Sequence, residues 1–388
     1  MNHLRELIAD RIRTSGPISF AEFMELSLYH PEFGYYARAA RKTGRAGDFF
    51  TSVDVGPAFG EFLARQFAEM WRIWSKVHGH EKGDGNLFRE TSAKKVPVPF
   101  FDLVEAGASD GRLSRDVLDS AARNDPDFYS AIRLSLVERS SAARAAQVET
   151  LGPHASLLAH SDAALPEDVR GVIYANELLD ALPTHAVVMT DSGLREVFVD
   201  YVDASGRFVE HLREPSTPRL AEYLSRAGAI MHHGARAEVN LSAEDWIKAA
   251  AGSLRQGFMV VIDYGHEDDS LYGGSHAAGT LTSFQRHTQM ADFLEDPGER
   301  DITAHVDLTA LTSTAQRAGL DVLGRLDQTY FLLGLGVADL ENATLQQRLA
   351  VKTLLMPGGL GSTHKVLIFG RGVGKPALKG CSYGERIT

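Results

Sequence analysis

The chain of 388 residues is long enough for one large domain with insertions, or for a main domain and a smaller one. Its formal net charge of −11 argues against a nucleic-acid partner and favours a cationic one, such as a basic protein or peptide. A single cysteine, Cys381, excludes an intrachain disulfide, and no apolar run is long enough for a membrane span. With no clear secretory or import segment, these features predict a bacterial-type cytoplasmic protein.

The first part of the chain is expected to be helical. Apolar residues recur at helical spacing over 4–12, and Ser19 with Glu22 forms a capping-box pattern that predicts a helix ending near Leu28.

An aromatic, glycine-rich loop over 29–52 follows, and it is too long for a simple connection. A functional loop and a surface insertion packed by its own tyrosines both fit this composition. After Pro57, apolar side chains at three- and four-residue steps predict a helix of the core. The polar stretch 77–99 is interpreted as a linker, so residues 1–95 are predicted to form an N-terminal helical segment.

The clearest signal of a binding site is a strand, a glycine turn and a helix in succession. The apolar run 100–104 predicts a buried parallel strand, which ends in the turn 105–111. Gly107 allows a tight turn, and Gly111 allows the helix to pack close to the strand. This arrangement presents backbone N–H groups and a helix N-terminus to a nucleotide-like ligand.

The spacing within the turn favours S-adenosylmethionine (SAM) over a dinucleotide. The G-x-G-x-x-G fingerprint is missing, and the pattern is nearer E-x-G-x-G-x-G with Ser109 at the middle glycine. The next predicted strand, 132–137, ends in Glu138, which can accept hydrogen bonds from both ribose hydroxyls. Asp162 follows a predicted strand near 155–159 and could accept from the adenine amino group. An ordinary βαβ turn with a solvated acid is the alternative.

Further acids follow the next strands. The predicted strand 171–175 ends in Asn176 and Glu177, with Asp180 close behind, and another buried strand is predicted over 258–262. Ligands of open α/β sheets bind outside the carboxyl ends of the strands, so these side chains are expected at one ligand-binding edge.

Between these strands, 185–213 predicts an antiparallel meander, and 265–303 is a long polar excursion. The chain closes with predicted helices at 308–318 and within 341–355, and predicted strands at 321–326 and 365–369. Four histidines show no ligand spacing and are expected on the surface, so no metal site is predicted; they are His232, His233, His276 and His287.

The predicted organisation is therefore an α/β domain over 96–370. It has insertions at about 185–240 and 265–305, and a flexible tail over 371–388.

Several uncommon tracts occur in an order that resembles one family. They are YHPEFGYY at 29–36, GDFFTS at 47–52, NE and DALP within 176–183, IDYG at 262–265, and PGE and TAHVD within 297–307. On these tracts the chain resembles, over about residues 1–370, the MidA-like SAM-dependent methyltransferases. That family includes the mitochondrial complex I assembly-factor protein arginine methyltransferases. The chain departs from the family in the glycine turn, where Ser109 and Asp110 stand in place of a glycine and an arginine.

The resemblance implies a Rossmann-like class I methyltransferase sheet, with an N-terminal helical lid and an inserted antiparallel meander that together cover the site. It also implies SAM as the cofactor. The turn is assigned to the methionine portion, the two acids after the next strands to ribose and adenine, and the lid loop closes on them. The residues expected to bind the cofactor are Asp48, Thr51, Glu105, Gly107, Ala108, Gly111, Glu138, Asp162 and Asn176.

The predicted activity is methylation of arginine in a protein, and the resemblance implies a respiratory-complex subunit as one candidate substrate. A guanidinium favours bidentate carboxylates, and its high pKa prevents a simple base from deprotonating it beforehand. Glu177 and Asp180 are therefore the candidate catalytic acids, with His305 as a candidate proton relay; a turn cap and a structural histidine are the alternative.

An assembly chaperone that binds SAM without turnover and a small-molecule methyltransferase remain open as other functions. A nucleotide-dependent oxidoreductase is disfavoured by the missing dinucleotide fingerprint.

Overall fold

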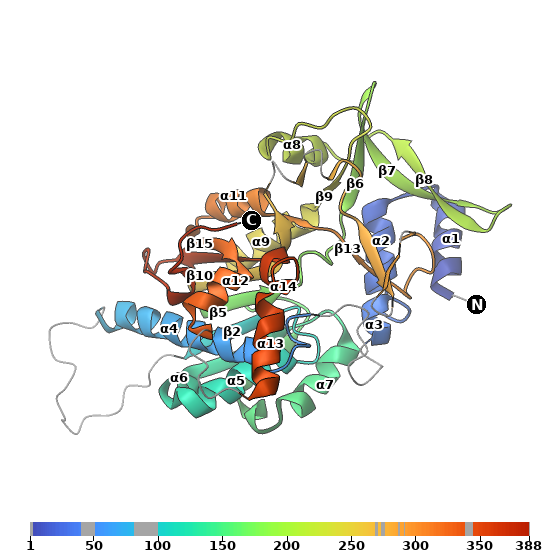
Figure 1. The fold of residues 1–388 in the computed structure, drawn as a ribbon. Helices are drawn as coiled ribbons and strands as arrows, with labels where there is room; N and C mark the ends of the chain where they lie inside the picture. The colour runs from blue at the N-terminus through green and yellow to red at the C-terminus, as the bar shows by residue number, and fades with distance from the viewer. Residues whose placement is uncertain are drawn as a thin grey trace, which may run out of the picture.

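A computed structural model describes residues 3–39, 51–80, 100–267, 271–272, 276–285, 288–290, 292–337 and 344–387. At its centre lies an eight-stranded sheet in the order β15-β16-β10-β5-β2-β3-β4, with β14 paired beside β10 (Figure 1). The strands are β2 (Phe101–Ala106), β3 (Ile132–Val137), β4 (Leu158–Asp162), β5 (Val169–Asn176), β10 (Leu254–His266), β14 (Val306–Asp307), β15 (Asp321–Asp327) and β16 (His364–Arg371).

The direction of the strands places the candidate site. The pairs from β10 through β5, β2 and β3 to β4 are all parallel, and β16 is antiparallel to both its neighbours. The chain runs outward from β2 to β3 and β4, and then crosses to β5 on the other side of β2. The strand order therefore reverses between β2 and β5, which is where open α/β sheets bind ligands. Because β16 is antiparallel, its first residue lies at the same edge as the last residues of the parallel strands.

Alternating side chains of the strands bury both faces of the sheet. Phe101 and Leu103 of β2 pack in the core beneath α4 (Ala58–His80) and α5 (Arg112–Asn124), while Val104 packs in a second core on the other face. The first core also includes residues of α12 (Gln328–Gly334) and α13 (Leu345–Leu355). The second core lies beneath α9 (Leu241–Ser253) and α11 (Leu308–Arg317). Apolar side chains on both faces of a strand are typical of parallel strands, which helices cover on both sides.

A second group of elements forms an accessory module beside this sheet, defined here as residues 3–39 and 185–239 (Figure 1). Its five-stranded sheet has the order β1-β7-β6-β9, with β8 paired to β7, so the N-terminal strand pairs with the insertion. The register joins Ile18 of β1 to Val199 of β7. The elements are α1 (His3–Ser15), β1 (Ile18–Ser19), α2 (Phe20–Tyr29), α3 (Tyr35–Ala39), β6 (His185–Thr190), β7 (Gly193–Val202), β8 (Arg207–Arg213), α8 (Arg219–Arg226) and β9 (Arg236–Val239).

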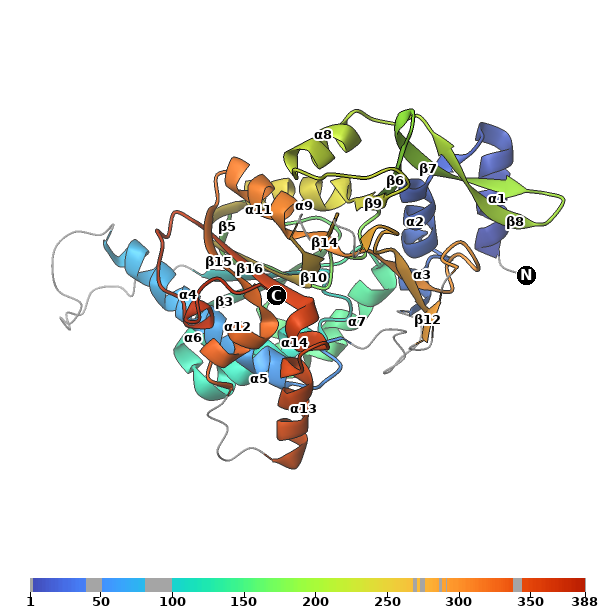
Figure 2. The same ribbon diagram turned by 45° about the horizontal axis from the view of Figure 1, so that its top comes forward.

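The apolar residues of α1 and α2 hold this module together. Ile8 and Phe23 pack with Val197 and Phe208 of the insertion. Ile302 joins the same cluster from a small sheet of order β12-β11-β13. That sheet is formed by β11 (Thr282–Gln285), β12 (Thr288–Met290) and β13 (Asp301–Thr303). Figure 2 shows α1 and α2 next to β7 and β8, with α8 above α9 and α11.

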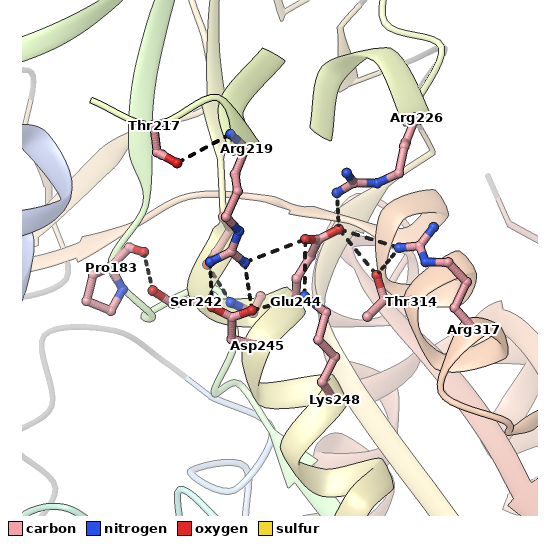
Figure 3. Close-up of polar contacts among 12 residues, drawn as sticks. Pro183, Thr217, Arg219, Arg226, Ser242, Glu244, Asp245, Lys248, Thr314 and Arg317 are labelled. Carbon is pink, nitrogen blue, oxygen red and sulfur yellow. Dashed lines mark hydrogen bonds and ion pairs between the residues drawn. The ribbon is translucent and has the colours of Figure 1, made fainter. Parts of the chain in front are cut away.

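An ionic cluster joins the accessory module to the helices of the main domain (Figure 3). Glu244 of α9 is 2% exposed, and its Oε1 accepts from Arg226 of α8 at 2.7 Å and from Thr314 of α11 at 3.3 Å. Further cations lie 3.7 to 3.9 Å from its carboxylate: Arg219, Lys248 and Arg317. We call these six residues the Glu244 cluster. Because its partners come from α8, α9 and α11, it connects three helices through one buried charge.

Most predicted elements are present, and the differences have local causes. Ser19 accepts a hydrogen bond from Glu22 N–H and caps α2, as the capping-box pattern predicts. A 3-10 helix, η1 (Gly152–Leu157), occupies part of the strand predicted near 155–159, so β4 begins later and ends at Asp162.

Two predicted segments are organised differently. The N-terminal segment predicted over 1–95 is divided, because α4 packs on the central sheet while α1 to α3 belong to the accessory module. The predicted flexible tail packs on the main domain: Leu378 is buried and Gly380 N–H donates to Gln66 of α4. None of the helices in the described ranges is long and apolar enough to cross a membrane.

Candidate functional site

The turn after β2 has the backbone conformation that its glycines predict. Gly107 and Gly111 have φ of +72° and +89°, and Ser109 is also left-handed at +46°. Only glycine adopts such angles freely, so the serine is held in a disfavoured region. The N–H groups of Gly107 and Ala108 donate to Val137 O at 2.9 and 3.1 Å. The turn is thereby fixed against the end of β3.

Glu105 supports this turn from within the protein. Its Oε2 accepts from Ser114 N–H at 3.1 Å, from the Ser114 hydroxyl at 2.5 Å and from Tyr174 Oη at 3.1 Å. Burial raises the pKa of the Glu105 carboxyl from 4.5 to about 7, against the opposing effect of these hydrogen bonds. The carboxylate expected to contact the cofactor therefore holds the first turn of α5 against the sheet.

Glu138 and Asp162 end two adjacent strands, as predicted. Glu138 accepts from the N–H groups of Ser109 at 2.9 Å and Ser140 at 2.7 Å, which brings its carboxylate to the glycine turn. Its own N–H donates to Asp162 O at 2.8 Å. Asp162 is exposed, and a hydrogen bond from Ala163 N–H lowers the pKa of its carboxyl. The structure thus brings both acids to the same sheet edge as the turn.

Glu177 connects the end of β5 to two other segments. The residue has a φ of +51°, and its Oε1 accepts from Ser52 N–H at 3.1 Å and from Asn176 Nδ2 at 3.2 Å. The Nε2 of His364 lies 3.3 Å from the same oxygen, within reach of an ion pair but without hydrogen-bond geometry. The buried hydroxyl of Ser52 donates to Gln328 at 3.2 Å. One oxygen of Glu177 is therefore fixed against Ser52, the last residue of the predicted lid loop.

Asp180 and Asp263 are buried acids beside Glu177, and we call these three residues the strand-end acids. Asp263 Oδ2 accepts from the N–H groups of Leu179 at 2.7 Å and Asp180 at 3.4 Å. Asp180 Oδ1 is buried and accepts no hydrogen bond from any described residue. Burial, reinforced by the charges of Asp263 and Glu177, raises the pKa of Asp180 well above its ordinary value. Burial also raises the pKa of Asp263 to about 7.

A cavity of about 410 Å³ opens beside Asp180 and also contains the predicted relay residue, His305, in its wall. Tyr264 and His276 line the same cavity. His305 Nδ1 is buried and has no hydrogen-bond partner among the described residues. Burial, followed by the charges of His266 and His276, lowers the pKa of His305 to about 4, so this imidazole is neutral at neutral pH. Asp180 and His305 are thus brought to one cavity, from segments more than a hundred residues apart.

The end of the predicted lid loop also reaches the glycine turn. Thr51 donates through its N–H and its hydroxyl to Asp54 Oδ2 at 3.2 and 3.0 Å. Asp54 Oδ1 lies 3.3 Å from a guanidinium nitrogen of Arg112, the first residue of α5. Asp48 lies outside the described residues, so its predicted contact with the cofactor stays a prediction.

Four residues near this edge were given no place in the predicted site: Ser52, Asp263, Tyr264 and His364. Asp263 follows the same end-of-strand rule as Glu177 and could have been included. His364 could not, because the sequence does not show that β16 is antiparallel. His276, predicted to lie on the surface, is half-buried next to His266, at 4.8 Å between ring centroids.

Comparison with known families identifies the family and its cofactor. A family model described as "Putative S-adenosyl-L-methionine-dependent methyltransferase" matches residues 62–326, more than half of the chain. The chain belongs to this family. The protein is therefore a SAM-dependent methyltransferase with SAM as its methyl donor, and the predicted family, fold class and cofactor are confirmed.

A solved structure agrees with this assignment over nearly the whole chain. A protein from Burkholderia thailandensis, solved with S-adenosyl-homocysteine bound, is 30% identical, with a TM-score of 0.82. The match covers 98% of this methyltransferase and 95% of that chain.

Curated relatives of this methyltransferase carry more specific names. A Caenorhabditis elegans protein, "Protein arginine methyltransferase NDUFAF7 homolog, mitochondrial", is 26% identical over 87% of this chain and 77% of its own length. The Danio rerio protein, "Protein arginine methyltransferase NDUFAF7, mitochondrial", is 30% identical over 85% and 76%. These names correct the predicted cytoplasmic location, because they point to mitochondria. One cysteine and a polar N-terminus do not distinguish between these compartments.

Proposed function

We propose that this methyltransferase transfers the methyl group of SAM to an arginine side chain of a protein substrate. The observation that carries the proposal is the buried Oδ1 of Asp180, which has no hydrogen-bond partner among the described residues and belongs to a residue that lines the cavity at the strand ends. A guanidinium supplies several N–H donors and a positive charge, which such a carboxylate lacks. The names of the relatives support the same acceptor.

The residues at the sheet edge fit SAM. Glu138 is already oriented by two backbone N–H groups and keeps lone pairs for ribose hydroxyls. Asn176 Oδ1 is buried with no hydrogen-bond partner within the described ranges, so it suits the ammonium group of the methionine portion. Bound SAM supplies a methyl group activated by the adjacent positive sulfonium. The role of the protein is to position the acceptor nitrogen in line with that methyl group. Such positioning supplies much of the acceleration in reactions of this kind.

The strand-end acids would orient the guanidinium and stabilise its positive charge while the N–CH₃ bond forms and the S–CH₃ bond of SAM breaks, and the nitrogen would release one proton to the candidate relay. A buried acid with a raised pKa tends to be protonated when no cation is near it, and a bound guanidinium favours the ionised form. Binding of arginine would therefore offset the cost of burying Asp180 as a charge. Glu177, held by Ser52 N–H through one oxygen, would present its carboxylate in a fixed orientation. His305 shares the cavity and remains the candidate proton relay.

The test is transfer of isotopically labelled methyl groups from SAM to proteins of a lysate that lacks this methyltransferase. Hydrolysis of the labelled proteins and mass spectrometry of the amino acids should find the label in methylated arginine. Transfer should fall steeply with Asp180→Asn. Label in another side chain or only in small molecules would contradict the proposal, and so would SAM binding by calorimetry with no transfer at all. The last result would favour an assembly chaperone.

A further inference from the structure

Three histidines come together at one end of the central sheet. His266 is the last residue of β10, His276 lies before β11, and His305 immediately precedes β14. Their ring centroids are 4.8 Å (266–276), 5.0 Å (266–305) and 6.1 Å (276–305) apart. One ligand nitrogen from each ring can be chosen so that all three lie within 4.8 Å of one another. In the part of the chain that the structure describes, this is the one group of three or more His, Cys, Asp or Glu side chains placed so that it could hold a metal ion.

The geometry approaches that of a metal site. Imidazole nitrogens bind Zn²⁺ at about 2.0–2.1 Å, which places two ligand nitrogens of a tetrahedral site about 3.4 Å apart. Small side-chain rotations that move each ligand nitrogen by roughly 1 Å would therefore bring the three nitrogens around one ion. Imidazole is a preferred ligand of zinc, copper and nickel. Three protein ligands also leave a fourth position open to water.

The surroundings favour a cation at this place. His276 and His305 line the cavity that also contains Asp180, so negative charge and space for a water ligand are both adjacent. His305 Nδ1 is buried and accepts or donates no hydrogen bond within the described ranges. An orphaned ring nitrogen of this kind needs an explanation, and a bound ion would provide one.

We propose that His266, His276 and His305 bind one divalent transition-metal ion, with Zn²⁺ as the first candidate. Backbone pairing already holds two of them together, because His266 pairs with Asp307 in the β10–β14 ladder. The segment of His276 reaches the same place through the hydrogen bond from His305 N–H to Thr280 Oγ1 at 3.1 Å and through the pairing of Thr282 with Thr303. The ion would add a direct link between the segment 276–282, which forms a wall of the cavity, and the end of β10.

This site and the proton-relay role make different demands on His305. A relay needs a ring nitrogen free to take up a proton, whereas a ligand nitrogen is occupied by the ion. Metal binding can be measured without SAM and without substrate. If no metal binds, the proposed methyltransferase function is therefore unaffected.

The experiment is a titration of the metal-freed full chain with Zn²⁺ by calorimetry, and with Co²⁺ by visible absorption. We expect one ion per chain and a Co²⁺ spectrum of a nitrogen-ligated tetrahedral site. His276→Ala should weaken binding by about 100-fold or more, since loss of an outer-shell partner alone costs 10- to 100-fold. His232→Ala, at an exposed histidine outside the cluster, is the matched control and should bind as the parent does.

Thermal unfolding provides a second measurement. Zn²⁺ should raise the unfolding temperature of the parent and of His232→Ala, and leave that of His276→Ala unchanged. Equal affinity in the parent and His276→Ala, or several weak sites per chain, would overturn the proposal. If His276→Ala does not fold, the Co²⁺ spectrum of the parent decides: an octahedral, weakly absorbing spectrum would contradict a three-histidine site.

Discussion

Glu244 and Asp180 are both buried carboxylates in the same protein, yet their surroundings are opposite. Glu244 receives a hydrogen bond from Arg226, and three further cations lie within 3.9 Å of it. Asp180 has no ion-pair partner among the described residues, and the charges that act on it most strongly are those of Asp263 and Glu177. The first carboxylate connects helices, and the second lines a cavity.

The different surroundings of Glu244 and Asp180 distinguish a buried carboxylate that stabilises the fold from one that serves a binding site. Burying an ion is costly unless a partner of opposite sign is buried with it. The Glu244 cluster supplies those partners from within the chain, so it needs nothing further. Asp180 Oδ1 has no hydrogen-bond partner among the described residues, so the cost of ionising this carboxyl is unmet there, which is the condition expected of a site that receives a cation as its ligand.

The largest effect is expected for Glu177→Gln. Glutamine keeps an oxygen that can accept from Ser52 N–H, but it removes the charge that would stabilise the guanidinium. Methyl transfer should fall on the order of a hundredfold or more, as when one electrostatic contributor is removed. SAM affinity by calorimetry should stay within about threefold, a change below ~0.7 kcal/mol. Transfer equal to that of the parent, or a collapse of SAM binding, would place Glu177 in a structural or cofactor role.

Glu105 is a third kind of buried carboxylate, because its hydrogen bonds come from uncharged donors, and the pH dependence of stability tests its role. Since its folded-state pKa of about 7 is raised from 4.5, its contribution to stability is complete below about pH 4.5 and is lost as the pH rises through about 7. The loss amounts to about 3 kcal/mol. Relative to the parent, Glu105→Gln should therefore gain about 3 kcal/mol of unfolding free energy between about pH 4.5 and pH 8.

Denaturant unfolding of both proteins at the two pH values measures this change. The comparison with the parent cancels the contributions of the other buried acids. A stability difference that does not vary with pH would show that Glu105 is ionised at no cost.

A smaller effect is expected for Glu244→Ala. The variant leaves several arginines without their shared partner, but these side chains are 38–47% exposed and can be hydrated. The unfolding free energy should therefore fall by only about 2 kcal/mol, below the 3–5 kcal/mol of a fully buried pair. Denaturant titration measures it, with the exposed Glu222→Ala of α8 as a control expected within about 0.5 kcal/mol of the parent. A loss of SAM binding at low temperature would contradict the purely structural role of the Glu244 cluster.

Local patterns were sufficient to predict the central sheet and its ligand edge. The apolar runs at 132–137, 171–175 and 258–262 lie within strands of the structure, and the run at 100–104 lies in β2 from its second residue on. The acids that follow them reach the same edge, because parallel strands present their carboxyl ends together. The glycines of the turn have the positive φ that their positions require.

Features that depend on contacts between distant segments were not predictable. The pairing of β1 with β7 joins residues about 180 positions apart, and nothing in the local sequence indicates it. The same holds for His364, which reaches Glu177 only because β16 is antiparallel, and for His276, which meets His266 across the excursion after β10. The strand before Asp162 begins later than predicted because residues 152–157 form a 3-10 helix.

Asp180→Asn tests the contrast between the two carboxylates most directly, with stability and methyl transfer measured on the same protein. Asparagine removes an ionisable carboxyl whose charged form no described residue pairs, so the variant should be at least as stable as the parent in denaturant at neutral pH. Its transfer of labelled methyl to arginine should nevertheless fall about a hundredfold, with SAM affinity unchanged. A variant that is less stable than the parent but transfers methyl groups at the parent's rate would contradict the account, because Asp180 would then be a structural residue like Glu244.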